Sequence, residues 1–139
     1  MKQHRRRQLL EAYRLARYEV DAEARFELRV DCASEPLMAL YDVHGVSTAS
    51  YVTAFNPQSV RHSDIANRRA HERLLASLGQ GGWPLLGGRA RDPDGAWPAE
   101  DSVLVLGISQ RQTLRLGQAF DQMAVLWCTA DAIPRLLEC

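Results

Sequence analysis

Apolar and polar positions follow two different periods in the first part of the chain. Over residues 3–20 the apolar side chains recur at the spacing of a helical stripe, which predicts an amphipathic helix. Over residues 24–30 they occupy every second position, which predicts a strand with one solvated face. Ser34 precedes residues 35–44 as a typical N-cap, and Gly45 follows them as a typical helix-ending glycine, which predicts a short helix over 35–44. The first predicted elements are therefore a helix, a strand and a second helix.

The segment from residue 50 to residue 129 predicts a second and more regular group of elements. In chain order they are a strand over 50–55, a helix over 64–78, strands over 83–87 and 102–108, a helix over 110–120 and a strand over 124–129. This βαββαβ order is that of the ferredoxin-like arrangement, whose two crossovers and central hairpin build an antiparallel sheet. We therefore predict an α+β fold with a mainly antiparallel sheet, a ferredoxin-like core over residues 50–129 and an N-terminal helix-strand-helix extension. A last strand is predicted over residues 133–137.

Length, composition and charge restrict the class of protein. A chain of 139 residues that is 46% hydrophobic is long enough for one core, so we expect a single α+β domain over residues 1–139. Seventeen basic and seventeen acidic side chains cancel, so no global charge attracts nucleic acid or anionic lipid. The three cysteines form no CxxC pair, and no apolar run reaches the roughly 18 residues of a membrane span. We expect a cytoplasmic protein with no membrane partner, and its oligomeric state stays undetermined.

The predicted connectivity brings polar segments to one edge of the sheet. The strand over 50–55 ends there, the helix over 64–78 begins there, and the loop over 88–101 and the corner over 118–122 lie there too. We call this edge the polar edge. The candidate ligand-binding residues on it are Asn56, Ser59, Asn67, Trp97, Glu100 and Gln122.

Each of these residues has a structural and a functional interpretation. Asn56 precedes a proline that cannot continue a central strand, or it presents its amide to a cleft. Asn67 lies on a buried helical stripe and needs partners, which are either the backbone of the preceding turn or a ligand. Trp97 either fills the end of the sheet or offers its ring to a ligand. Glu100 has the chemistry to bind a cation, to accept a hydrogen bond or to act as a base. His71 is interpreted as a histidine at the edge of the core rather than a catalyst.

Common catalytic signatures are missing from the sequence. It contains no GxxxxGK[ST] phosphate loop, no HExxH and no GxSxG, and its glycines lack the context of a dinucleotide fingerprint. We therefore expect no cofactor and no metal site of the common kinds.

Three segments, YVTAFNPQS, RDPDGAWPAEDSVLVLGIS and LGQAFDQMAVLW, form a recognisable set together with a first helix that ends in Ala16-Arg17-Tyr18. With these motifs the chain resembles the uncharacterised bacterial domain-of-unknown-function family 3293 (DUF 3293). The resemblance extends over almost the entire chain and implies a bacterial origin. The family has no assigned activity, so the resemblance implies no catalytic residue.

The residues favour a binding function over catalysis. Amides, one aromatic ring and one carboxylate suit recognition of a polar partner, and no nucleophile–base pair accompanies them. The leading hypothesis is a non-enzymatic binding domain for a small polar ligand or a peptide at the polar edge.

Two alternatives remain. One is a hydrolase in which Glu100 with Asp92 or Asp94 activates water, with help from Mg²⁺. The other is nucleic-acid binding through two arginine-rich helices, which the cancelling charges make the weaker hypothesis. The arginines concerned are Arg5, Arg6, Arg7, Arg14 and Arg17 in the first segment and Arg68, Arg69 and Arg73 in the second.

Overall fold

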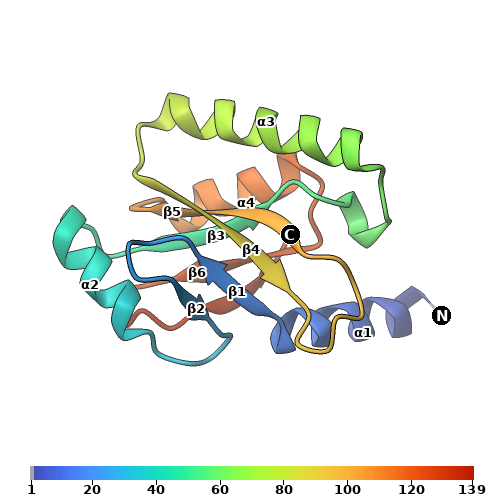
Figure 1. The fold of residues 1–139 in the computed structure, drawn as a ribbon, viewed down its shortest axis with the longest axis horizontal. Helices are drawn as coiled ribbons and strands as arrows, with labels where there is room; N and C mark the ends of the chain where they lie inside the picture. Colours follow the sequence, from blue (N-terminus) through green and yellow to red (C-terminus); the bar gives the residue numbers. More distant parts are fainter. Residues whose placement is uncertain (1) are drawn as a thin grey trace.

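Seven strands pair into one continuous sheet in the computed structural model, which describes residues 2–139. Within these residues the helices are α1 (Lys2–Leu15), α2 (Glu35–His44), α3 (Asp64–Gly81) and α4 (Gln110–Ala119), and η1 (Pro57–Ser59) is a short 3-10 turn. The strands are β1 (Arg17–Val20), β2 (Phe26–Leu28), β3 (Ala49–Thr53), β4 (Leu85–Arg91), β5 (Glu100–Leu106), β6 (Ala124–Cys128) and β7 (Arg135–Glu138). Neighbouring strands are antiparallel throughout, in the order β2-β1-β4-β5-β3-β6-β7 (Figure 1).

The α+β class and the antiparallel sheet are confirmed, whereas the ferredoxin-like four-stranded core is wrong. The strands expected to form that core lie side by side as β4-β5-β3-β6, but they are only the middle of a seven-stranded sheet. β1 pairs with the outer side of β4, and β7 pairs with the outer side of β6, so neither end of the expected core is an edge. The predicted helix over 3–20 is also too long, because it ends at Leu15 and β1 follows.

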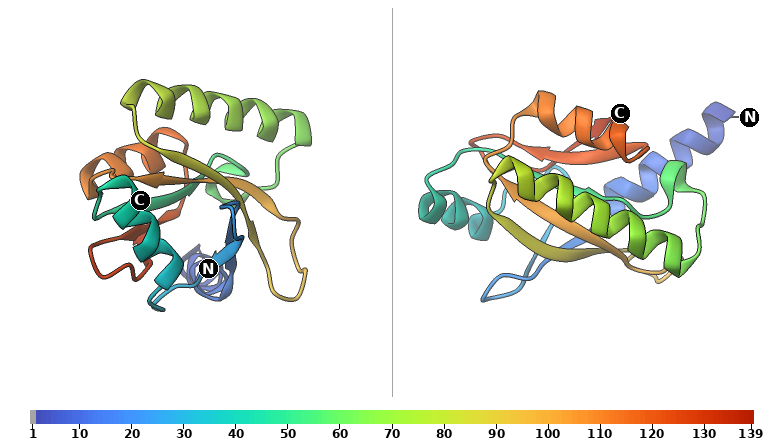
Figure 2. Two further views of the ribbon diagram at one scale, coloured as in Figure 1. Left: turned by 60° about the vertical axis from the view of Figure 1, so that its left-hand side comes forward. Right: turned by 90° about the horizontal axis from the view of Figure 1, so that it is seen from above.

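Helices α3 and α4 cover one face of this sheet, as Figures 1 and 2 show. Leu74 and Leu78 of α3 pack there with Val52 of β3 and with Val103 and Val105 of β5. These side chains are almost completely buried. The alternate residues of the same strands point to the other face of the sheet. This other face forms the interior next to the polar edge.

The other face is concave because the two ends of the sheet come together. Leu28 of β2 and Leu126 of β6 belong to one buried cluster, although several strands separate them in the sheet. The backbone N–H of Asp31 donates to the carbonyl of Pro134 at 2.8 Å, which ties the segment after β2 to the segment before β7. The sheet is thus a curled half-barrel (Figure 2).

Tyr51 spans the interior of this half-barrel. Its hydroxyl donates to the carbonyl oxygen of Glu19 on β1 at 2.6 Å, across β5 and β4. The close approach requires glycine at position 88, because a Cβ there would overlap the Glu19 carbonyl and lie 2.8 Å from the Tyr51 hydroxyl oxygen. The strand expected over 83–87 begins two residues later, at Leu85, and it continues through Gly88 to Arg91, where the sequence had indicated a loop.

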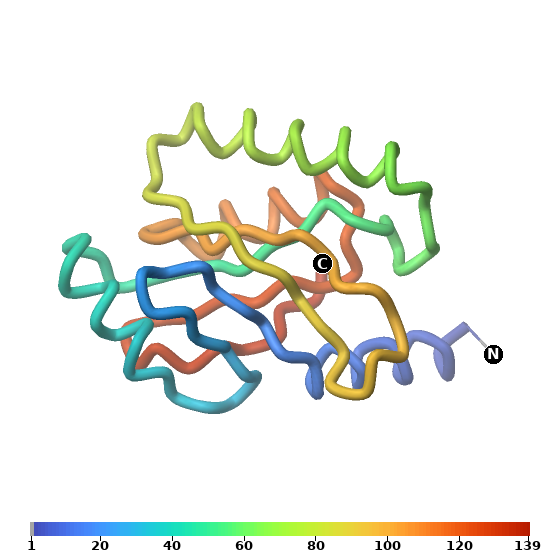
Figure 3. The backbone as a smooth tube through the Cα atoms, viewed as in Figure 1, coloured from blue at the N-terminus to red at the C-terminus, as the bar shows by residue number. Residues whose placement is uncertain are grey.

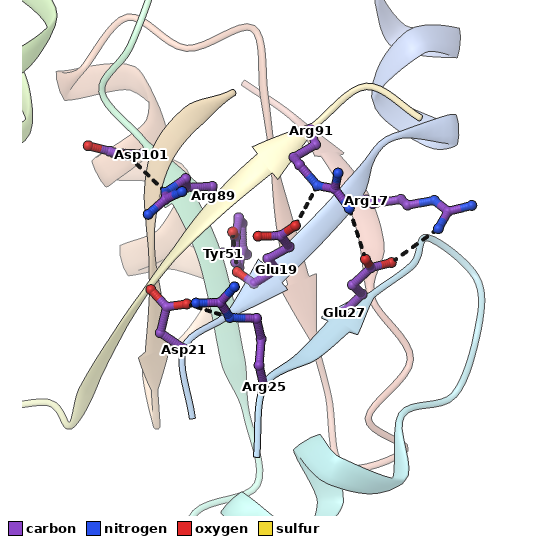
Figure 4. Close-up of polar contacts among 9 residues, drawn as sticks. All are labelled: Arg17, Glu19, Asp21, Arg25, Glu27, Tyr51, Arg89, Arg91 and Asp101. Carbon is purple, nitrogen blue, oxygen red and sulfur yellow. Dashed lines mark hydrogen bonds and ion pairs between the residues drawn. The ribbon is translucent and has the colours of Figure 1, made fainter. Parts of the chain in front are cut away.

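Charged side chains cover the outer surface of β2, β1, β4 and β5 (Figure 4). The ion pairs are Arg17–Glu27 at 3.7 Å, Arg25–Asp21 at 3.2 Å, Arg89–Asp101 at 3.8 Å, Arg91–Glu27 at 3.3 Å and Arg91–Glu19. Solvated pairs of this kind contribute about 0–1 kcal/mol each. They lie on the side of the strands that faces water, and the alternation of side chains along β1 places Tyr18 and Val20 on the buried concave side.

Candidate functional site

The turn that follows β3 has an unusual backbone. Asn56, Gln58 and Ser59 have φ values of 46°, 55° and 59°, which lie in the left-handed region that non-glycine residues seldom adopt. The turn is fixed at the corner after α4, where the Gln58 N–H donates to the Asp121 carbonyl at 2.9 Å. The Gln58 side-chain amide contacts the same carbonyl at 3.0 Å. Strained backbone of this kind persists only where the surroundings hold it, and it is frequent at binding and active sites.

A chain of amide hydrogen bonds connects this turn to Glu100. The Asn67 Oδ1 atom accepts from the backbone N–H of Asn56 at 2.9 Å, and the Asn67 Nδ2 atom donates to Asn56 Oδ1 at 2.9 Å. Asn56 Oδ1 also accepts from the backbone N–H of His62 at 2.9 Å, so the Asn56 oxygen is fully used. The Asn56 Nδ2 atom consequently points the other way and donates to Glu100 Oε2 at 2.7 Å.

Glu100 begins β5 and brings a half-buried carboxyl group to the concave face. Burial raises the pKa of Glu100 above its usual value, and the hydrogen bond from Asn56 opposes this rise only in part. No salt bridge to Glu100 forms anywhere in residues 2–139. The protein therefore holds a carboxyl group in a partly desolvated place without giving it a counter-charge.

Two adjoining cavities share this carboxyl group. The inner cavity, about 40 Å³, lies inside the half-barrel, and the outer pocket, about 230 Å³, lies between α1, the η1 turn and the loop over 92–99. Both are lined by Tyr13, Asn56, Trp97 and Glu100. The course of the loop over 92–99 beside α1 can be followed in Figure 3.

Three tyrosines surround the inner cavity, and their hydroxyl groups are all engaged elsewhere. The Tyr13 hydroxyl pairs with Ser59 Oγ, the Tyr18 hydroxyl donates to the Tyr13 carbonyl at 2.5 Å, and the Tyr51 hydroxyl donates to Glu19. Tyr18 and Tyr51 contact each other edge to face, with ring centroids 5.3 Å apart. Burial raises the pKa of Tyr13 to about 12 and also raises the pKa values of Tyr18 and Tyr51, so all three are neutral at physiological pH. They present ring surface rather than hydroxyl groups to the cavity.

The structure brings the residues predicted for the polar edge together. Asn56, Trp97 and Glu100 line both cavities, Ser59 lines the outer pocket and Gln122 lines the inner cavity. The Gln122 side-chain amide donates to the Phe55 carbonyl at 3.1 Å.

Asn67 has a different place from the other predicted residues. It is only 5% exposed, lines neither cavity and orients Asn56. Trp97 is partly buried against the concave core, so its ring both covers the sheet end and borders the two cavities.

Sequence reasoning missed the tyrosines and one arginine. Tyr13 lies within the predicted helix over 3–20 and Tyr51 within the predicted strand over 50–55, and periodicity alone does not distinguish either of them from a core residue. The signal that could have distinguished them is the hydroxyl group, because a buried tyrosine needs a partner for it and therefore spans from the core to a polar edge. Arg61, an exposed residue after η1, lines the outer pocket and was not considered.

Of the acidic residues in the hydrolase alternative, Asp92 has a structural role in a turn. Asp92 Oδ2 accepts from the backbone N–H groups of Asp94 at 3.1 Å and Ala96 at 2.8 Å, which shapes the turn between β4 and β5. Neither aspartate lines the cavities that contain Glu100. In residues 2–139 no group of three or more histidine, cysteine, aspartate or glutamate side chains is placed to hold a metal ion.

The arginines of the nucleic-acid alternative do not form one surface. α1 and α3 lie on opposite sides of the sheet in the views of Figures 1 and 2. Arg6 pairs with Glu138 at 3.1 Å, and Arg17 pairs with Glu27.

His71 contacts the ring of Phe55 edge to face, with ring centroids 6.2 Å apart. It sits at the edge of the core as expected, but its Nδ1 atom is buried and has no hydrogen-bond partner within the described chain.

Fold and site together define an α+β protein with a half-barrel sheet and an aromatic cavity beside one carboxyl group. The model of the family described as "Protein of unknown function (DUF3293)" matches residues 52–125, more than half of the chain, and the chain belongs to this family. The matched segment contains all the residues predicted for the polar edge, whereas Tyr13, Tyr18 and Tyr51 precede it. No curated protein and no solved structure matches the chain. None of the helices within residues 2–139 is both long and apolar enough to cross a membrane.

Proposed function

We propose that this protein is a non-enzymatic binding domain that takes a small polar ligand or a peptide segment into the two adjoining cavities. The observation that carries the proposal is the hydrogen-bond chain from Asn67 through Asn56 to Glu100, which orients polar groups at the place where both cavities meet. Polar groups held in fixed orientations among aromatic rings are the usual composition of a ligand site.

The composition of the cavities favours binding over catalysis. Their lining contains no histidine, cysteine or lysine. The hydroxyl of Ser59 is paired with Tyr13, and the hydroxyl of Ser102 donates to the carbonyl of Glu100 at 3.0 Å. Nucleophilic catalysis needs a hydroxyl or thiol beside a base, and the Glu100 carboxyl group is instead held by an amide.

The strained η1 turn also supports a binding role. Its left-handed residues keep Asn56 and Ser59 at the mouth of the pocket at a cost of order 1–3 kcal/mol for each residue. Left-handed non-glycine residues also occur at Asp31, Asp121 and Ala132, so the support comes from the place of Asn56 and Ser59 at the pocket and not from the strain alone.

A thermal-shift screen with a broad panel of small polar metabolites and short peptides tests the proposal. We expect at least one class of compound to raise the melting temperature of the wild type. Trp97→Ala should abolish that rise, whereas Trp83→Ala, a change at the opposite end of β4, should keep it. The proposal is overturned if no compound stabilises the wild type or if Trp97→Ala responds like the wild type.

A further inference from the structure

Glu100 is the only charged side chain that lines the inner cavity. One of its carboxylate oxygens, Oε2, accepts the hydrogen bond from Asn56, and no hydrogen bond to Oε1 forms within residues 2–139. An anionic ligand group would be repelled there, and a neutral one would leave the carboxylate without a counter-charge. A cation is the group that completes the site.

The aromatic rings favour the same kind of group. Because the hydroxyls of Tyr13, Tyr18 and Tyr51 are engaged with other parts of the protein, these residues offer their rings to the cavity. Trp97 adds an indole ring that borders both cavities. The face of an aromatic ring carries negative electrostatic potential and attracts ammonium groups, most strongly where water is excluded.

The sizes of the cavities set the shape of the ligand. The inner cavity, at about 40 Å³, is the smaller of the two and has room for a small group such as an ammonium ion. The outer pocket, at about 230 Å³, has room for a short carbon chain, and Leu9, Ala12 and Pro98 give it apolar walls. Arg61 also lines this pocket but is exposed to solvent and forms no salt bridge with Glu100, so the inner cavity keeps Glu100 as its one charged side chain.

We propose that the ligand is a small primary amine whose ammonium group lies between Glu100 and the ring faces of Tyr13 and Trp97, with its carbon chain in the outer pocket. This inference rests on the proposed binding function and specifies the chemistry of its ligand. The ammonium group donates to Glu100 Oε1, and the amide of Asn56 keeps the carboxylate in place. Burial disfavours the charged form of Glu100 and raises its pKa, and a bound ammonium group offsets that penalty with the counter-charge that residues 2–139 do not supply.

Three compounds of matched length test the inference by nuclear magnetic resonance: n-butylamine, butyramide and sodium butyrate. Each is titrated into the ¹⁵N-labelled full chain at neutral pH, and the readouts are the indole N–H of Trp97 and the backbone amides of Asn56 and Glu100. We expect saturable shifts with n-butylamine only. In Glu100→Gln the affinity for n-butylamine should fall about tenfold or more, because the charge-assisted hydrogen bond is lost while an acceptor for Asn56 remains.

Asp101→Asn is the matched control. It removes a carboxylate from the neighbouring residue, whose side chain pairs with Arg89 on the outer surface (Figure 4), so n-butylamine affinity should not change. Saturable binding of butyramide or butyrate without the amine would overturn the amine inference and leave the proposed binding function standing. Absence of a response to all three compounds, or an unchanged affinity in Glu100→Gln, would overturn the inference as well, and the metabolite screen would then decide the binding function separately.

Discussion

Replacing Asn67 with alanine removes the side chain that holds Asn56 in its left-handed conformation. The substitution eliminates two hydrogen bonds of 2.9 Å, one to the backbone N–H of Asn56 and one to its side-chain oxygen. The side-chain oxygen of Asn56 still accepts from the His62 N–H, so it loses only one of its two hydrogen bonds. The backbone N–H of Asn56 has no replacement acceptor in the described chain and becomes unpaired.

The expected cost follows from these two losses. The bond between the two side chains contributes about 1 kcal/mol net, and an unpaired backbone donor at a half-buried position costs about 1–3 kcal/mol. Asn67→Ala should therefore lower the free energy of unfolding by about 2–4 kcal/mol, which for a chain of this size corresponds to a fall in Tm of roughly 10 °C. The gain in helix propensity from alanine offsets only about 0.5 kcal/mol of this.

Urea unfolding followed by circular dichroism measures the difference. Arg68→Ala is the matched control, because it changes the adjacent residue of α3 at an exposed position and should alter stability by no more than about 0.5 kcal/mol. If Asn67→Ala costs less than about 1 kcal/mol, the reasoning is refuted. The contact between Gln58 and Asp121 would then be what fixes the turn.

Two further substitutions test the fold and the carboxyl group. Gly88→Ala should cost about 3 kcal/mol or more, because its Cβ meets the rigid Glu19 carbonyl, whereas Gly79→Ala in α3 meets no atom within 4 Å and should stabilise by about 0.5–1 kcal/mol. Equal thermal unfolding of the two variants would contradict this. The pKa of Glu100 is raised above its usual 4.5, so this carboxyl group binds its proton more tightly in the folded wild type than in the unfolded chain. The wild type therefore loses stability as the pH rises from 4.5 through the raised pKa of the folded state. Glu100→Gln cannot ionise, so in urea unfolding across a pH series it should gain stability relative to wild type above pH 4.5, and a difference independent of pH would refute the assignment.

The sequence predicted the order of elements over residues 50–129 well, because each has its own period and its own caps. A capping box of Ser109 and Gln112 begins α4, where a helix over 110–120 was expected, and the strand expected over 102–108 is β5 at the centre of the sheet. β1 was missed for a physical reason. Ala16 and Val20 are four residues apart, so they fit a helical stripe as well as they fit the buried face of a strand beside Tyr18.

The curl of the sheet could not be predicted from periodicity. It depends on contacts between distant segments, such as the hydrogen bond from Asp31 to Pro134, that leave no local pattern. The connectivity did place Asn56, Asn67 and Glu100 at one edge, but the inner cavity beside Asn56 and Glu100 also depends on Tyr51, which crosses the concave face. The left-handed backbone at Gln58 and Ser59 is equally hidden, because neither residue type prefers that conformation.

The ends of the half-barrel have a consequence for how the protein behaves at high concentration. Its two outermost strands are short, β2 spanning Phe26–Leu28 and β7 spanning Arg135–Glu138, and charged residues lie on both. Long, flat, apolar edges serve as templates for strand addition and aggregation, and these edges offer few free backbone groups for that purpose. The hydrogen bond from Asp31 to Pro134 joins the segment after β2 to the segment before β7. This connection further limits the pairing of these edges with strands of other molecules. The same closure that shapes the interior of the sheet thus protects its periphery.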